Sequence, residues 1–179
     1  LDEAVVPVRL ADGDPDVVSG RLSRGHRLHD DSLVVPDASS YVSVLAGAGV
    51  QVDRQARGEA IRGCLEEAAQ RHGGRADLPD SLFEELVDLV ESPQLIEGTI
   101  EERFLALPPE VLSTVMRAHQ RYVPLLRADA PADPLALDAH ASLLPQFLCI
   151  GNGLPEAVET IRRGNERVLR ARLADAAFF

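Results

Sequence analysis

The chain has 179 residues, a length typical of a single domain or of one larger and one smaller lobe. Its net charge of −11 argues against a protein that coats nucleic acid or membranes non-specifically. The apolar runs are far shorter than the roughly 18 residues of a transmembrane helix. The two cysteines, Cys64 and Cys149, do not suffice for a disulfide framework or a zinc site. We interpret both as buried thiols, which favours a reducing, cytoplasmic compartment and no membrane partner.

The first third of the chain favours short strands followed by a short helix. The sequence pattern predicts strands over residues 4–10 and 17–24. Residues 34–36 predict an edge strand, because the proline has no N–H to donate to a central ladder. Asp37 is a typical N-cap, so a helix is expected over residues 38–45.

Two amphipathic helices are expected in the middle of the chain. The first begins at Asp53 and ends at Gly73-Gly74. Its apolar face comprises Ile61, Cys64, Leu65, Ala68 and Ala69. The second is capped by Asp80 or Ser81 and ends before Pro93. Its apolar face comprises Leu82, Phe83, Leu86, Leu89 and Val90.

A hairpin with a long connection is expected further on. Residues 94–100 predict a strand, and Pro108-Pro109 presets the first turn of another helix. Residues 122–126 and 144–150 predict two strands that pair with each other. The connection between them, residues 128–143, is rich in Ala, Asp and Pro and is expected to be a loop insertion.

The end of the chain predicts two helices. Pro155 is expected to open a helix that Gly164 breaks, and Asn165 then caps a final helix over residues 166–177. We expect Phe178 and Phe179 to dock on a further domain of a longer protein, because two aromatic rings at a natural C-terminus would be exposed.

The order of these elements favours the α+β class, with a mixed or antiparallel sheet and several packed helices, since strict βαβ alternation is missing. We expect an α+β domain over residues 1–154. The C-terminal helices, residues 155–179, are expected to lead into a downstream domain.

Charge is distributed unevenly along the chain. Residues 161–179 carry five arginines against two acids, whereas the rest of the chain is strongly acidic. Arg167 and Arg170 can share a helical face, and Glu166 is expected to pair with Arg170. Two interpretations of the cluster, which includes Arg172, remain open: a solvated or ion-paired face, and contact with RNA.

No catalytic site is evident. The chain lacks lysine and the standard phosphate-binding, hydrolase and metalloprotease motifs. The densest polar cluster is Arg24-Gly25-His26-Arg27-Leu28-His29. His26 could hydrogen-bond the backbone, or face RNA or an interface. His26 and His29 together could bind a metal, although a third ligand is needed and only Asp30 and Asp31 lie close by. Arg24 and Arg27 could enclose a phosphate or pair with nearby aspartates.

A second polar cluster joins a predicted helix to a predicted strand at His119-Gln120-Arg121. Gln120 and Arg121 offer planar donors suited to bases or phosphates, and their alternative role is to cap the helix. His119 falls near the apolar side of the helix. It is therefore interpreted as a core or capping histidine rather than a general base.

Several segments, read in order, resemble a known family. They are Arg24-Gly25-His26-Arg27, residues 83–93, residues 104–112, His119-Gln120-Arg121-Tyr122, Leu144-Pro145-Gln146-Phe147 and residues 164–179. In this order and spacing they resemble the beta subunit of the bacterial two-subunit glycyl-tRNA synthetase. The run 164–179 is the most specific segment. The resemblance covers an internal segment from the N-terminal half of that subunit.

The resemblance implies a division of labour. In such enzymes the alpha subunit carries the active site, which uses ATP and Mg²⁺ to activate glycine, and the beta subunit supplies tRNA binding and assembly. The resemblance also implies an α+β fold similar to the editing-type module of the phenylalanyl-tRNA synthetase beta subunit. We therefore expect a non-catalytic segment without a cofactor or metal of its own. Its expected partners are glycine tRNA, the alpha subunit and the other domains of the beta subunit.

The residues expected to face tRNA or an interface are Arg24, His26, Arg27, Gln120, Arg121, Arg167, Arg170 and Arg172. A purely architectural scaffold is the alternative. A hydrolytic editing domain that uses His26 or His119 is a third, less favoured interpretation.

Overall fold

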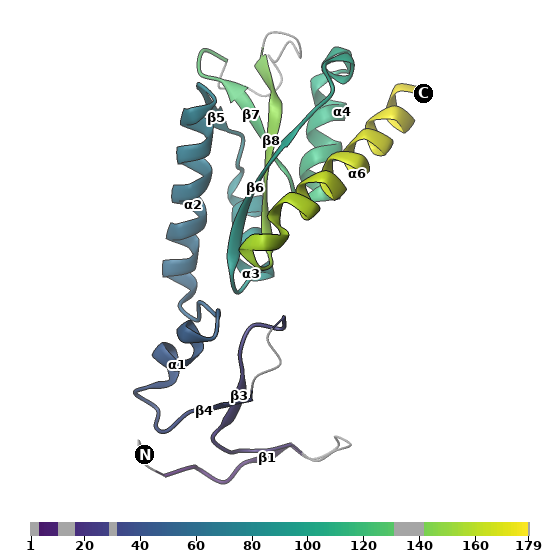
Figure 1. Cartoon of the computed structure of the whole chain (residues 1–179). Coiled ribbons are helices and arrows are strands. Elements are labelled where there is room, and N and C mark those ends of the chain that lie inside the picture. Colours follow the sequence, from purple (N-terminus) through teal and green to yellow (C-terminus); the bar gives the residue numbers. More distant parts are fainter. Residues whose placement is uncertain (1–3, 11–16, 29–31, 131–141, 179) are drawn as a thin grey trace. The chain divides into compact units, whose positions relative to one another are not determined.

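The computed structural model describes residues 4–10, 17–28, 32–130 and 142–178 (Figure 1). The chain divides into two compact units, residues 1–54 and residues 55–179. The boundary expected at residues 154 and 155 falls inside the second unit. None of the described helices is both long and apolar enough to cross a membrane.

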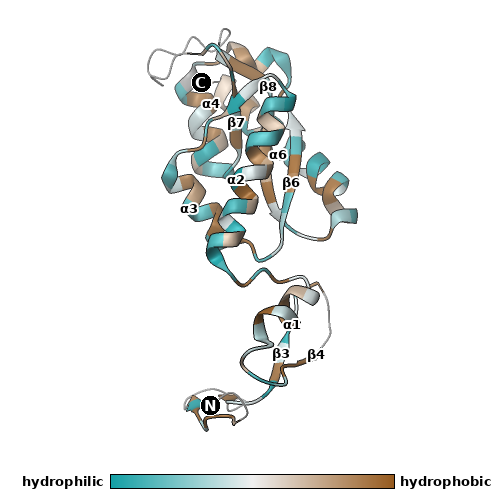
Figure 2. Ribbon diagram, turned by 90° about the vertical axis from the view of Figure 1, so that its left-hand side faces the viewer, coloured by the Kyte–Doolittle hydropathy of each residue, from teal (hydrophilic) through white to brown (hydrophobic). Residues whose placement is uncertain are grey.

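The first unit consists of short antiparallel ribbons and one helix. Strand β1 (Arg9–Leu10) pairs with β2 (Val17–Val18), and β3 (Leu22–Arg24) pairs with β4 (Ser32–Val34). The strand expected over residues 17–24 is therefore interrupted between β2 and β3. Hydrophobic and hydrophilic segments both occur along β3 and β4 in Figure 2.

Helix α1 (Tyr41–Gly47) begins three residues later than expected. The Asp37 carboxylate accepts hydrogen bonds from the Ser40 N–H at 2.8 Å and the Ser39 hydroxyl at 2.6 Å. These bonds close a turn ahead of the helix. The prediction of a helix capped by Asp37 was wrong because an aspartate can stabilise such a turn as well as a helix start.

The second unit is built on a four-stranded antiparallel sheet with the strand order β5-β7-β8-β6. Its strands are β5 (Gly74–Ala76), β6 (Pro93–Thr99), β7 (Val123–Arg127) and β8 (Leu143–Asn152). This confirms the α+β class with an antiparallel sheet, and the expected pairing of the last two strands. Within the expected insertion 128–143, residues 131–141 lie outside the described part of the chain.

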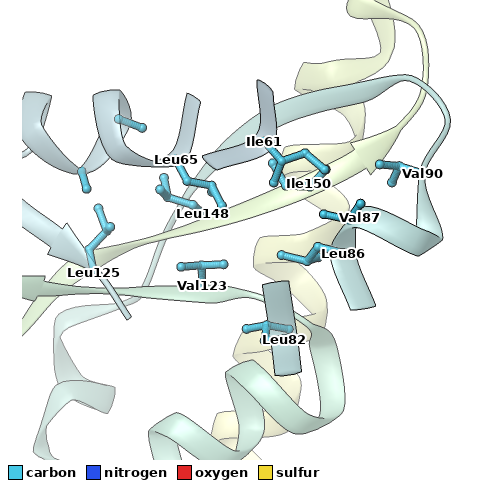
Figure 3. Close-up of a cluster of buried hydrophobic side chains, with 12 residues drawn as sticks. Ile61, Leu65, Leu82, Leu86, Val87, Val90, Val123, Leu125, Leu148 and Ile150 are labelled. Atoms are coloured by element: carbon cyan, nitrogen blue, oxygen red, sulfur yellow. The ribbon is translucent and has the colours of Figure 1, made fainter. Parts of the chain in front are cut away.

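Helices α2 (Arg54–Arg71) and α3 (Asp80–Leu89) pack on one face of this sheet. Figure 3 shows Ile61 and Leu65 of α2 against Leu148 and Ile150 of β8. The other labelled residues of this cluster are Leu82, Leu86, Val87, Val90, Val123 and Leu125. The expected core face of α2 is confirmed, and Gly73, with φ of +70°, follows the end of the helix.

Two details of α3 differ from expectation. Pro79, rather than Asp80 or Ser81, is its N-cap residue. Leu89, expected in the core, is 53 % exposed. The helix ends at Leu89, and the extended residue Val90 enters the core in its place.

The opposite face of the sheet is covered by the short 3-10 helix η1 (Glu102–Ala106), α4 (Pro109–Ser113), the π-helical turn η2 (Thr114–His119) and α6. Phe147 of β8 is fully buried here and stacks on Tyr122, with ring centroids 4.7 Å apart. Gly98 lies directly across from Phe147, and a Cβ at this position would overlap the phenylalanine ring. A glycine is therefore required on β6 at this point.

The C-terminal segment forms one helix where two were expected. A short 3-10 turn, η4 (Pro155–Ala157), leads into α6 (Val158–Phe178), which continues through Gly164 (Figure 1). A mid-helix glycine costs only about 1 kcal/mol, and burial of Leu169 and Leu173 offsets this penalty. Asn165 is not a cap: its side-chain amide donates to Cys149 Sγ at 3.5 Å.

Candidate nucleic-acid interface

Helix α6 carries five arginines, three of which are neutralised by acids. Arg162 forms ion pairs with Glu159 and Glu166, each at 2.7 Å. Arg163 pairs with the same Glu159 at 2.8 Å, and Arg170 pairs with Glu101, just beyond β6. The pairing expected between Glu166 and Arg170 was wrong, because Glu166 is engaged one turn earlier.

The shared carboxylate Glu159 stabilises the first turns of α6. Hydrogen bonds from Arg162, and then from Arg163, lower the pKa of Glu159 from its ordinary 4.5 to about 2. Hydrogen bonds to Glu159, and then to Glu166, raise the pKa of the Arg162 guanidinium further above its ordinary value. Both arginines therefore remain matched by negative charge over the physiological pH range.

Arg167 and Arg172 differ from the other arginines of α6. Both are exposed, and neither has an ion-pair partner among the residues that the structure describes. Arg167 lies one turn beyond Arg163 on the outer face of the helix, and Arg172 lies roughly 140° further around it. These two guanidinium groups are the α6 charges available to a polyanion without the loss of an internal ion pair.

The end of the π-helical turn η2 holds Gln120 and Arg121. Arg121 has φ of +56°, and its N–H donates to the Arg117 carbonyl at 3.1 Å. Its guanidinium forms an ion pair with Glu85 of α3. Gln120, the C-cap residue, is half-buried. Both residues therefore lie where a residue caps the C-terminal end of a helix, which is one of the two roles that the sequence left open for them.

His119 was interpreted as a core or capping histidine, and its exposure shows that the core alternative was wrong. Its place as the last residue of η2 leaves the capping alternative as a prediction. The expectation assumed a repeat of 3.6 residues from Val111 onward. The turn from Thr114 to His119 is π-helical, which shifts the faces of the helix. Arg117 in the same turn pairs with Asp77 at 3.3 Å, and burial raises the pKa of Asp77.

The cluster Arg24-Gly25-His26-Arg27 lies in the first unit and is fixed to the end of α1. The His26 N–H donates to the Ala48 carbonyl at 2.9 Å, and the His26 Nδ1 accepts the Leu28 N–H at 3.3 Å. A Cβ at Gly25 would lie 2.7 Å from the Ala48 Cβ. Only glycine fits this close approach.

The burial of His26 decides what its ring can contact. His26 is only 1 % exposed. Such burial favours the structural role considered from the sequence, in which the histidine hydrogen-bonds the backbone. Arg24, at the end of β3, and Arg27 are exposed on either side of it. Of this cluster, the two arginine side chains are exposed to solvent and the histidine ring is not. The described residues contain no group of three His, Cys, Asp or Glu side chains placed to bind one metal ion.

Two functional features escaped sequence reasoning. The π-helical turn has no simple sequence signal, because local propensities do not separate it from an α-helix. The acids that neutralise Arg121 and Arg170, Glu85 and Glu101, lie 36 and 69 positions away in the chain. Only the fold shows which arginines form ion pairs with distant acids and which do not.

Comparison with known proteins agrees with this order of segments. The family model of the glycyl-tRNA synthetase beta subunit matches residues 1–179. The chain belongs to this family. The glycine–tRNA ligase beta subunit of Picosynechococcus sp. is 43 % identical over 180 residues, which cover 99 % of this chain. That of Trichodesmium erythraeum is 40 % identical over 100 % of this chain, and that of Bacillus subtilis is 38 % identical over 92 % of it.

The chain spans about a quarter of the length of these family members: 24 % of the Trichodesmium and Picosynechococcus subunits and 22 % of the Bacillus one. The match is continuous across both units. The run 164–179, which carries the most specific resemblance to the family, therefore forms most of helix α6.

Proposed function

We propose that this chain is a non-catalytic part of a glycine–tRNA ligase beta subunit, where it contributes to the binding of glycine tRNA and to assembly of the enzyme. The whole enzyme would charge tRNA with glycine in the cytoplasm. ATP and Mg²⁺ would bind to the alpha subunit rather than to this chain. The alpha subunit and the remaining domains of the beta subunit would be its protein partners.

One observation carries the tRNA-binding part of the proposal: α6 has two exposed arginines whose charge is unmatched within the described structure. Arginine recognises phosphate through a planar fork of donors, and each phosphate contact contributes a salt-dependent increment of affinity. Arg167 and Arg172 meet this requirement on an otherwise acidic chain. Arg170, Arg121 and Gln120 would be secondary contacts, since the two arginines would first have to leave their acids.

The test uses the intact two-subunit enzyme and glycine tRNA at several salt concentrations. Replacing Arg167 and Arg172 by serine is expected to weaken binding and to reduce the salt slope by about one per arginine lost. Arg163→Ser is the matched control, because Arg163 lies on the same helix but is paired with Glu159. An unchanged salt slope in the double variant would contradict phosphate contact.

A purely architectural scaffold is the second candidate. It is favoured by the ion pairs of Arg162, Arg163 and Arg170, which show that α6 arginines also serve internal structure. A scaffold predicts that the double variant keeps its tRNA affinity but loses association with the alpha subunit. Analytical ultracentrifugation of the mixed subunits, run beside the tRNA titration, separates the two candidates.

We also propose a fold relationship between residues 55–179 and the editing-type module of the phenylalanyl-tRNA synthetase beta subunit. The antiparallel sheet with helices on both faces supports it. Editing activity does not follow from such a relationship. The intact enzyme is expected to release no amino acid from mischarged glycine tRNA at a site in this chain. Substitution of the exposed His119 would leave any deacylation unchanged.

A further inference from the structure

The ribbon formed by β1 and β2 has an apolar face that lies open to solvent. Leu10 of β1 lies directly across from Val17 of β2, so these two side chains share one side of the ribbon. Strand β1 covers only the end of the strand expected over residues 4–10, and Val6 and Val8 lie in the segment just before it. The four side chains are between 54 % and 62 % exposed.

The ribbon formed by β3 and β4 repeats this pattern. Leu22 lies directly across from Val34, and these side chains are 74 % and 60 % exposed. In the second unit, by contrast, the sheet is covered on both faces. Among the residues that the structure describes, eleven of the fourteen exposed large hydrophobic ones lie in residues 1–54, which form less than a third of the chain. Large apolar side chains are therefore exposed far more often in the described part of this unit than in the second unit.

The backbone of this unit is also incomplete as a sheet. In the described part of the chain, each of the four strands belongs to a ribbon of two, and no third strand joins either ribbon. Two-stranded ribbons of two or three residues are at best marginally stable in water. The outer edges present backbone groups to which another strand can pair.

A hollow of about 430 Å³ lies within the same unit, between the β1 segment and the start of α1. Val5, Val6, Val35 and Tyr41 contribute to its lining. The two charged residues of the lining are already engaged: the Arg21 guanidinium donates to the Pro36 carbonyl, and the Asp37 carboxylate accepts from Ser39 and Ser40. The hollow therefore suits an apolar side chain rather than a charged ligand.

We propose that a β-strand from the same beta subunit, outside residues 1–179, completes this unit. The strand would pair with a ribbon edge, lay apolar side chains over Val6, Val8, Leu10 and Val17, and fill the hollow. An open edge beside an apolar face fits a strand, whereas RNA would require a basic surface. The family members are about four times as long as this chain, so their own polypeptide can supply the strand. A ribbon this short is unstable until another strand covers it. A covering strand from the same polypeptide is present while the unit folds, which favours this source over a separate subunit.

The test is hydrogen exchange of the amides in residues 4–10 and 17–24. It compares the 179-residue chain, a full-length beta subunit that contains it, and that subunit bound to the alpha subunit. Exchange is expected to be at least about tenfold slower in the full-length beta subunit alone, with no further slowing by the alpha subunit. The amide of Leu148, in the central strand β8, reports in each sample whether the second unit is folded.

Three results would overturn the proposal. Equal exchange in the 179-residue chain and in the full-length subunit would mean that no strand is added. Slowing only in the presence of the alpha subunit would assign the surface to that partner. Slowing in the 179-residue chain that depends on its concentration would assign it to a second copy.

A pair of variants in the full-length subunit keeps the test decisive if the 179-residue chain does not fold alone. Val8→Thr with Leu10→Thr is expected to speed exchange of residues 17–24 by about tenfold, because the covering strand loses its apolar contacts. Leu89→Thr is the control, since Leu89 is exposed to the same degree on α3. Equal exchange in both variants would show that the ribbon face is open to solvent in the whole subunit.

Discussion

Glu166 of helix α6 accepts a hydrogen bond at 3.0 Å from the backbone N–H of Thr99, the last residue of strand β6. Strand β6 is an edge of the four-stranded sheet, so its outer backbone groups have no neighbouring strand. Helix α6 lies along this edge (Figure 1), and Glu166 supplies one of the missing acceptors. The contact fixes α6, and the arginines on it, to the sheet.

Replacement of Glu166 by alanine is expected to destabilise the second unit by about 0.5–1 kcal/mol. The variant removes the acceptor of the Thr99 N–H, which water can replace in part because Thr99 is exposed, and it removes an ion pair of Arg162. Urea denaturation of the 179-residue chain measures the change. Glu166→Gln retains an acceptor oxygen and should lose less than the alanine variant. Equal losses in the two variants would mean that the hydrogen bond to Thr99 contributes nothing.

The sequence predicted well those elements in which the spacing of apolar residues matches the face that packs against the core. Ile61, Leu65 and Ala68 repeat at helical spacing over about two turns of α2, and all three are buried. The failure at Gly164 has the opposite cause. A single glycine is a strong local signal, but its penalty is small beside the burial of Leu169 and Leu173 one and two turns later.

The candidate interface could be predicted only in outline. Sequence shows that residues 161–179 are basic, but the helix break expected at Gly164 concealed the pairing of Arg162 with Glu166. It does not show that Arg170 meets Glu101, because that pair depends on how α6 docks beside β6. The burial of His26 likewise depends on the approach of Ala48, 22 positions away.

Gly164→Ala is expected to stabilise the 179-residue chain by about 0.5–1 kcal/mol. Alanine has the higher helix propensity, and a Cβ at Gly164 would meet no atom within 4 Å. Thermal or urea denaturation measures the gain. A loss of stability would indicate that the helix does break at this residue, as its sequence suggested.

Gly98→Ala is the same substitution as Gly164→Ala, but it is expected to lower the stability of the chain. The added methyl group would overlap the buried Phe147 ring, so the strand or the ring has to move. Overpacking of this kind costs about 1–3 kcal/mol. A neutral effect at residue 98 would show that Phe147 has room to turn away from β6.

The carboxylate of Glu159 is expected to titrate near pH 2 in the folded chain, well below its ordinary 4.5, and Arg162 is the main cause. A folded-state pKa below the unfolded value means that the ion pairs stabilise the fold fully above about pH 4.5. This contribution is lost as the pH falls from 4.5 towards 2.

Carbon-detected NMR of the glutamate carboxyl groups measures the midpoint of the Glu159 titration directly. Arg162→Ser should raise it more than Arg163→Ser, since Arg162 donates two hydrogen bonds to Glu159 and Arg163 donates one. A midpoint near 4.5 in the unsubstituted chain, or a larger shift from Arg163→Ser, would mean that Arg162 is not the principal partner of Glu159 in solution.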